Sequence, residues 1–240
     1  MTLPLFPTAA LSHIDRSQAC DLALKQAYAR LEKTVDWLES QPDETSVRIH
    51  CLFARLYLYD TKYWFKTPAL DENADFLKLF AARFMDGYFN QVIDVVRQGE
   101  LPDAGNWSKY FKRTEKLTMR SNIFLHLIVT ITALRTHICC DLPEALLAAA
   151  DDYERLFGHP MQLVENRNLF FAPSNQAVFY DAILEFMEFH QTHPSLFRRT
   201  TLDFFAILVR LSRGIWWPIL NGWRLSSWIG FESRIEKSAV

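Results

Sequence analysis

The chain has 240 residues, of which 50% are hydrophobic, 14% aromatic and 22% charged, and its formal net charge is −2 at pH 7. So high an apolar content excludes an intrinsically disordered protein, and a charge so close to zero excludes broad electrostatic attraction to nucleic acid. A chain of this length is able to bury a large core. We therefore expect one folded domain over residues 1–240, without nucleic acid as a partner.

The four cysteines indicate a reducing compartment. Cys139 and Cys140 are adjacent, and neither they nor Cys20 and Cys51 form a Cys-x-x-Cys pair, so the chain is not a disulfide framework. The N-terminus lacks the basic segment and long apolar run of a secretory signal. No uninterrupted apolar run reaches the roughly 18 residues of a membrane-spanning helix. These features predict a cytoplasmic protein with no transmembrane segment.

Apolar residues recur at helical spacing along the whole chain, and there are only 7 glycines. After an irregular arm over residues 1–16, helices are predicted at 17–40, 45–65 and 73–98. Further helices are predicted at about 118–140, 141–157, 175–191, 197–213 and 215–228, with an irregular segment or short helix at 160–174 and a flexible tail at 230–240. The pattern predicts an all-α, single-domain bundle of about seven to nine helices around the buried 118–140 helix.

The segment 121–140 is the most informative part of the chain. Its only fixed charge is Arg135, and a helix that is apolar almost all round is typical of the centre of a bundle. Nevertheless Asn122, His126, Thr130 and His137 fall close together on one side of this helix. Polar side chains on a buried helix need partners. The stripe is therefore either a structural network or a functional site.

His137 and Asp141 are the best candidates for chemistry, because they are one helical turn apart. With ligands from another helix they could hold a divalent transition metal. Alternatively, His137 is a general base that Asp141 orients, assisted by His126 and Asn122. His126 lies roughly 16 Å from His137 along the helix, too far for both to bind one metal ion. In the structural alternative, Asp141 caps the next helix, with Glu144 three positions later.

Other catalytic patterns are weaker. Two acidic rows at helical spacing lack the Glu-x-x-His pairs of ferritin-like di-metal proteins, and each lies opposite an apolar row, so we expect solvated faces with ion pairs. Glycine-rich phosphate loops and nucleophile elbows are absent from the sequence. Cys139 or Cys140 is either a thiol nucleophile near His137 or a packing residue. The two acidic rows are Asp86, Asn90, Asp94 and Asp181, Glu185, Glu188.

The C-terminal region offers an alternative function. Four tryptophans lie among three arginines between residues 210 and 228, a combination that suits a membrane interface or a partner surface. Under this hypothesis the protein is not an enzyme, and it binds an apolar ligand, a protein partner or a membrane surface; the aromatic surplus also makes a homodimer plausible. The competing interpretation is a helix docked on the bundle, with its arginines solvated. The tryptophans are Trp216, Trp217, Trp223 and Trp228.

Short segments between about residues 50 and 220 form a further pattern. The most distinctive is the run His137-Ile-Cys-Cys-Asp141-Leu-Pro. The others are Phe53-Ala-Arg-Leu-Tyr57, Phe80-Ala-Ala-Arg-Phe84 with Tyr88, Gly99 and Pro102 before Trp107, His126, and Arg213-Gly-Ile-Trp216. Together they resemble a bacterial family of helical proteins known as domain of unknown function 5995, which tends to have Asn or a small residue where this chain has Arg135 and Thr136. The resemblance implies an all-helical fold and no particular activity.

Overall fold

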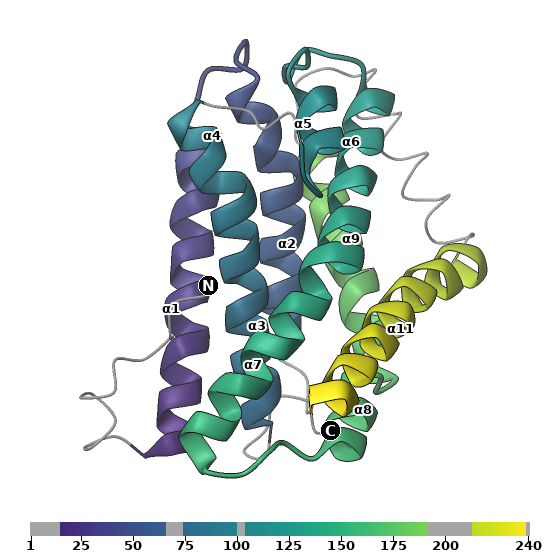
Figure 1. The fold of residues 1–240 in the computed structure, drawn as a ribbon. Helices are drawn as coiled ribbons and strands as arrows, with labels where there is room; N and C mark the ends of the chain where they lie inside the picture. Colours follow the sequence, from purple (N-terminus) through teal and green to yellow (C-terminus); the bar gives the residue numbers. More distant parts are fainter. Residues whose placement is uncertain (1–14, 66–73, 100–103, 192–212, 239–240) are drawn as a thin grey trace.

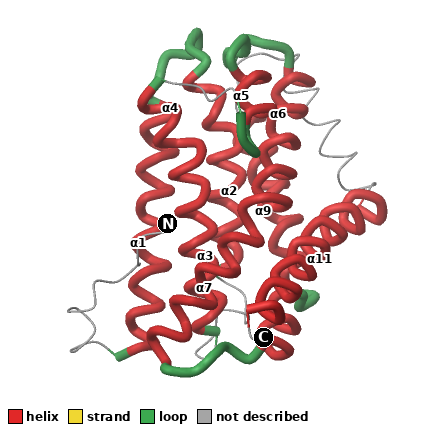
Figure 2. Tube along the Cα trace, viewed as in Figure 1, coloured by secondary structure: helices red, strands yellow, loops and turns green. Residues whose placement is uncertain are grey.

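The computed structural model describes residues 15–65, 74–99, 104–191 and 213–238. Within these residues the chain forms eight helices, counting helices that continue into one another once, and no strand (Figure 2). The all-helical class predicted from the spacing of apolar residues is therefore confirmed. The predicted helix at 197–213 lies, except for its last residue, outside the described residues, as does most of the predicted N-terminal arm.

The first half of the chain builds three long, roughly parallel rods (Figure 1). They are α1 (Arg16–Glu39), α2 (Cys51–Trp64, entered through a 3₁₀ turn at Val47–His50) and α3 (Asp75–Tyr88), which runs through a π-helical turn at Phe89–Ile93 into α4 (Asp94–Gln98). The second half adds α5 (Ser108–Thr114), α6 (Ile123–Thr136), a π-helical turn at His137–Asp141, α7 (Leu142–Phe157), α8 (Leu163–Phe170), α9 (Ser174–Gln191) and α11 (Arg213–Ser238). α3 packs against both α1 and α7, α2 packs against α9, and α11 packs against α7.

Part of the polar side of α3 is not solvated, contrary to the sequence-based expectation, although Asn90 of the predicted row is exposed. Only 7% of Arg83 is exposed, and its partner on α7, Asp152, is 3% exposed. Arg83 Nε lies 2.6 Å from Asp152 Oδ2, and Arg83 Nη2 lies 3.0 Å from Oδ1. On the same side of α3, Arg30 of α1 lies 3.8 Å from Asp86 and 3.3 Å from Asp94. The expectation failed because α1 and α7 both pack over this side, which turns a polar row into an interhelical network.

The segment from Ile123 to Phe157 is one continuous helix, so the predicted break at residue 141 is wrong. The N–H of Leu142 donates to the carbonyl of His137, five residues earlier, which is the hydrogen bond of a π-helical turn. Pro143 follows directly and has no N–H to donate. The wider turn therefore carries the helix past a proline that the sequence pattern placed at a helix start.

This helix is also less central than its composition predicts. The predicted polar stripe does face the core, since His126, Thr130 and His137 are all buried. The opposite side exposes large apolar side chains, with Phe124 at 54% and Ile131 at 56%. Tertiary packing has thus buried the side with the polar groups, and these groups find their partners locally: His126 at the carbonyl of Thr118, Thr130 at the carbonyl of His126, and His137 at Asp141.

One helix of the described residues, Ile123–Phe157, is long and apolar enough to cross a membrane by length and composition alone. It has 35 residues, and its most apolar stretch has a mean hydropathy of 1.7 and is 39% buried. A core helix of a soluble protein meets the same criterion, so the predicted lack of a transmembrane segment stays a prediction.

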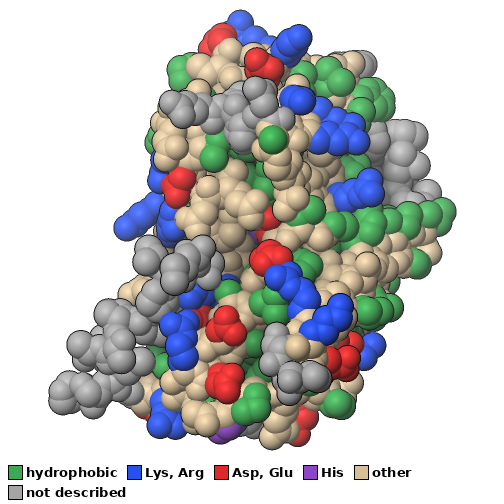
Figure 3. All heavy atoms as spheres, viewed as in Figure 1, with side chains coloured by type: hydrophobic (Ala, Val, Ile, Leu, Met, Phe, Trp, Pro, Cys, Tyr) green, Lys and Arg blue, Asp and Glu red, His purple; other side chains and the backbone are tan. Residues whose placement is uncertain are grey.

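α11 is a single helix that continues to Ser238, beyond the start of the predicted flexible tail. Trp228 is fully buried against Phe170 and Phe231, and the other three tryptophans of α11 are half-buried. The large apolar side chains that α11 exposes are instead Ile215, Ile219, Leu225 and Ile229. Hydrophobic side chains accordingly gather along this part of the surface (Figure 3). The helix is therefore docked through its tryptophans.

A buried histidine near one end of the bundle makes stability dependent on pH. His50 is 3% exposed, and its Nδ1 lies 2.8 Å from the hydroxyl of Tyr110. Burial lowers the pKa of His50 from 6.5 to about 3. Between these two values the unfolded chain binds the proton and the folded chain does not, so this group's contribution to stability is complete above pH 6.5 and is lost as the pH falls.

Replacing His50 by Gln is expected to flatten this dependence. The free-energy advantage of the wild type over His50→Gln should shrink by about 1.4 kcal/mol for each pH unit below 6.5, because one proton is taken up on unfolding. Urea denaturation at pH 7, 6 and 5 measures the difference in unfolding free energy between wild type and His50→Gln. The contributions of all other titrating groups are the same in both proteins and cancel. His159→Gln, at an exposed histidine, is the control. A constant difference between wild type and His50→Gln over this range would contradict the prediction.

Candidate functional site

The structure brings His137 and Asp141 into direct contact. His137 Nδ1 lies 2.8 Å from Asp141 Oδ2, and both residues are 2% exposed. A carboxylate can only accept hydrogen bonds, so Nδ1 carries the hydrogen and donates it. The other ring nitrogen, Nε2, is thereby left as an acceptor. The predicted pair is thus an imidazole in one tautomer, held by a carboxylate.

Asp141 is fixed by two further donors from distant parts of the chain. Trp107 Nε1 lies 3.1 Å from Oδ2 and 3.2 Å from Oδ1, and Gln91 Nε2 lies 3.0 Å from Oδ1. Gln91 belongs to the π-helical turn that follows α3, and Asp141 to the one that precedes α7. π-helical turns are frequent at functional sites, because the extra residue re-aims side chains. The carboxylate makes no capping bond to the start of α7, so the predicted cap is wrong.

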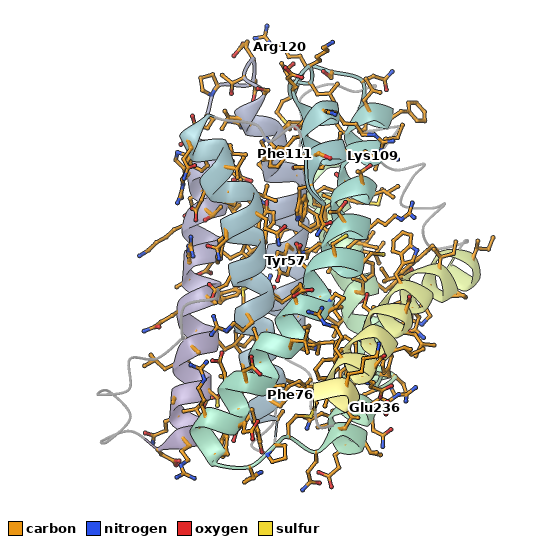
Figure 4. The ribbon with its side chains drawn as sticks, viewed as in Figure 1. Tyr57, Phe76, Lys109, Phe111, Arg120 and Glu236 are labelled. Atoms are coloured by element: carbon orange, nitrogen blue, oxygen red, sulfur yellow. The ribbon has the colours of Figure 1, made fainter. Side chains whose placement is uncertain are left out.

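Aromatic rings enclose the imidazole of His137. Phe84 stacks on it with ring centroids 3.6 Å apart and planes 8° apart, while Tyr57 and Phe53 meet it edge-on at 4.8 and 5.6 Å. Tyr57 lies near mid-height of the bundle, between the labelled Phe111 and Phe76 (Figure 4). Burial lowers the pKa of His137 below its usual 6.5, opposed by the hydrogen bond and charge of Asp141. The imidazole is therefore neutral at pH 7.

His137 lines a cavity of about 110 Å³ between α2, α3, the π-helical turn at His137–Asp141 and α11. This volume is below the roughly 150 Å³ of a cavity that holds benzene, so the cavity takes at most one ring or a short chain. Nε2 of His137 is buried and has no hydrogen-bond partner among the described residues. Apolar and aromatic side chains dominate the walls, among them Phe80, Phe84, Phe179, Trp217 and Leu220.

Asp60 and Arg224 supply opposite charges to the same cavity. Burial raises the pKa of Asp60 to about 6, although Arg224 lowers it. Burial also lowers the pKa of Arg224 to about 10, although Asp60 raises it. Asp60 stands alone in an aromatic-rich helix and was not predicted as a site residue, and Arg224 was expected in solvent. The one sequence feature that could have indicated Asp60 is helical spacing, since Asp60 lies one turn after Tyr57 on α2.

The other two predicted site residues, His126 and Asn122, lie elsewhere. His126 Nε2 lies 2.9 Å from the carbonyl of Thr118. Asn122 caps α6 by accepting a hydrogen bond from the N–H of Phe124 at 2.9 Å. Neither residue lines the cavity, because three helical turns separate His126 from His137. Both have structural partners near the start of α6.

The metal hypothesis finds no ligand set in the part of the chain that the structure describes. No group of three His, Cys, Asp or Glu residues there is placed to hold a metal ion. Both oxygens of Asp141 already accept hydrogen bonds, and one of them faces His137 itself. This geometry corresponds to a carboxylate that orients a histidine rather than to two ligands of one ion.

The neighbouring thiols are not activated nucleophiles. Burial raises the pKa of Cys139, opposed by Arg135, and also raises that of Cys140. A reactive cysteine requires a lowered pKa, because the thiolate is the nucleophile. At neutral pH both side chains are thiols. Cys139 is exposed and Cys140 is half-buried, so the packing alternative does not hold for Cys139.

No family model, curated protein or solved structure matches the chain. The resemblance of its short segments to domain of unknown function 5995 therefore stays a prediction, and the function is argued from the site alone.

Proposed function

We propose that the protein binds a small, mainly apolar molecule in the cavity beside His137, and that Nε2 of His137 accepts a hydrogen bond or a proton from it. The observation that carries this proposal is the unpartnered, buried Nε2. Leaving such an acceptor unsatisfied costs about 1–3 kcal/mol. A bound hydroxyl or amine would remove that cost.

The arrangement suits general-base chemistry. The imidazole is neutral at pH 7 because burial lowers its pKa, so Nε2 is ready to accept a proton. Asp141 would stabilise the imidazolium that forms, as the carboxylate does in a Ser-His-Asp triad. The aromatic walls would keep water from competing with the bound molecule. The protein would then be an enzyme that removes a proton from its substrate.

A metal ion at this place would need at least two ligands besides Nε2. None of the described His, Cys, Asp or Glu residues provides such a set. The general-base role requires only the groups that the structure brings together, so it is the better supported form of the proposal.

A second candidate is contact with an apolar partner or a membrane surface without catalysis. It is supported by the exposed side chains of Ile215, Ile219 and Ile229 on α11 and of Phe124 and Ile131 on α6. The tryptophans that first suggested this function face inward, so the isoleucines would have to carry it. Binding of the protein to phosphatidylcholine vesicles, with no binding of small phenols, would favour this candidate.

The proposal predicts that phenol binds more tightly than toluene, which has the same shape but no donor. In His137→Asn the new amide can still donate to Asp141, while Nε2 is lost. Phenol affinity should then fall about tenfold, the equivalent of about 1.4 kcal/mol, and toluene affinity should change little. Isothermal titration calorimetry measures both constants.

The matched control is His126→Asn, which changes a buried histidine of the same helix away from the cavity. It should leave phenol affinity within a factor of about two. Equal binding of phenol and toluene by the wild type, unchanged in His137→Asn, would identify an apolar cavity without a base. Failure of both compounds to bind would overturn the proposal.

A further inference from the structure

We infer that Arg224 forms a carboxylate-binding subsite in the cavity, so that the bound molecule is a small hydroxylated organic acid, the size of a hydroxybenzoate. The assignment of a hydroxyl group to this molecule rests on the proposed function of His137. The assignment of a carboxylate depends only on Arg224. Both residues line the same cavity.

The guanidinium of Arg224 is held in place by its surroundings. Its central carbon lies 4.5 Å from the ring centroid of Phe170, 5.3 Å from that of Phe171 and 5.9 Å from that of Trp217. It also donates a hydrogen bond to the carbonyl of Phe170. A planar guanidinium stacked on aromatic rings keeps its edge free for a carboxylate. The group is therefore positioned before any ligand arrives.

Most of the hydrogen-bonding capacity of Arg224 is unused. A guanidinium has five N–H donors, and the carbonyl of Phe170 is the one acceptor found for them among the described residues. No carboxylate of those residues lies within 4.0 Å of it, although Arg30, Arg83 and Arg234 all have such partners. Asp60 acts on Arg224 through its charge but forms no ion pair with it within 4.0 Å, so the edge of the guanidinium is available to the carboxylate of a ligand.

The electrostatics of the cavity agree with a bound acid. Arg224 is the one cation among the described cavity-lining residues, and it stays charged at pH 7 even though burial lowers its pKa to about 10. Asp60 is the one carboxyl group on those walls, and it opposes an anionic ligand. Removing the charge of Asp60 should therefore strengthen the binding of an acid.

The walls favour an organic acid over an inorganic anion. Phe84, Phe179 and Trp217 give the cavity aromatic sides, which would contact the carbon body of the ligand and repel a fully hydrated ion. The volume of about 110 Å³ limits that body to about one ring.

The test compares the three isomeric hydroxybenzoates with phenol by calorimetry on the full chain. The tightest isomer is expected to bind at least tenfold more tightly than phenol. Arg224→Gln should abolish this gain, which is measured as the ratio of acid to phenol affinity so that a general effect of the substitution on the cavity cancels. Arg224→Lys should retain only part of the gain, because it keeps the charge but lacks the planar fork. Asp60→Asn should strengthen acid binding severalfold.

The outcomes separate this inference from the proposed function. The inference is overturned if the acids bind no better than phenol, or if Arg224→Gln and Arg224→Lys leave the ratio of acid to phenol affinity unchanged. Neither result would affect the dependence of phenol affinity on His137. If benzoate binding depends on Arg224 but phenol binding is independent of His137, the inference stands and the proposed function fails. Competition by inorganic phosphate as strong as that by benzoate would also overturn the carboxylate class.

Discussion

Replacing Asp152 by alanine is expected to lower the free energy of unfolding by about 3–5 kcal/mol, because it takes the Asp152 carboxylate away from the buried guanidinium of Arg83. Arg83 of α3 makes two short contacts with the Asp152 carboxylate of α7, and both residues are almost fully buried. Asp86, 3.9 Å from Arg83, keeps a weaker interaction, which places the expected value near the lower end of the range.

Urea denaturation at pH 7 measures the effect, and Asp151→Ala is the matched control. Asp151 is the preceding residue of the same helix and is exposed, so its loss should change stability by less than about 0.5 kcal/mol. Replacing Arg83 by Met and Asp152 by Leu together should cost much less than Asp152→Ala, since no lone charge is then buried. Equal stability of Asp151→Ala and Asp152→Ala would show that this ion pair does not hold α3 against α7.

Arg83 also shows why part of the fold could not be read from the sequence. The spacing of apolar residues predicted the bounds of α1, α2 with its entry turn, the continuous α3–α4 helix and α9 to within a few residues, because that pattern belongs to each helix alone. It did not predict α5 or the true end of α11. A polar row, however, looks the same whether it meets water or the polar row of another helix. Only the packing of α1 and α7 on the same side of α3 decided that Arg83 is buried.

The candidate site, too, could be predicted from the sequence only in part. The contact between His137 and Asp141 could be predicted, since residues four apart on a helix are neighbours. Trp107 and Gln91 could not, because they come from 34 and 50 residues away in the sequence and meet Asp141 only through tertiary packing. The π-helical turns were also invisible, because a single inserted residue hardly changes the apolar pattern. Pro143 was instead taken as the start of a new helix.

The same geometry explains why the polar pair is buried at all. Asp141 accepts hydrogen bonds from His137, Trp107 and Gln91, so the carboxylate itself is well satisfied. The imidazole beyond it has one nitrogen satisfied and one, Nε2, that is not. A network built only for stability would have no need to keep that last acceptor next to a cavity.

Replacing Asp141 by alanine is expected to destabilise the protein by about 3–5 kcal/mol, because two buried donors and the half-buried amide of Gln91 lose their acceptor at once. The variant should also lose its preference for phenol over toluene, because the ring of His137 is no longer held in one tautomer and orientation. Urea denaturation and calorimetry with the two compounds measure these effects. Trp107→Phe is the control for a single lost donor, and it should destabilise the protein by about 1 kcal/mol while the preference for phenol persists.

Asp141→Asn separates the charge of Asp141 from its hydrogen bonds. The new amide oxygen can still accept from His137 and Trp107, and Gln91 can turn its own amide oxygen toward the new amine, so we expect a loss of only about 1 kcal/mol in stability. The negative charge that raises the pKa of His137 against burial is gone, so that pKa should fall further. An imidazole that is a weaker base is a weaker acceptor, so phenol affinity should fall while toluene affinity stays constant. Unchanged phenol affinity in this variant would show that Asp141 acts on His137 through position alone, and the general-base role would lose its electrostatic support.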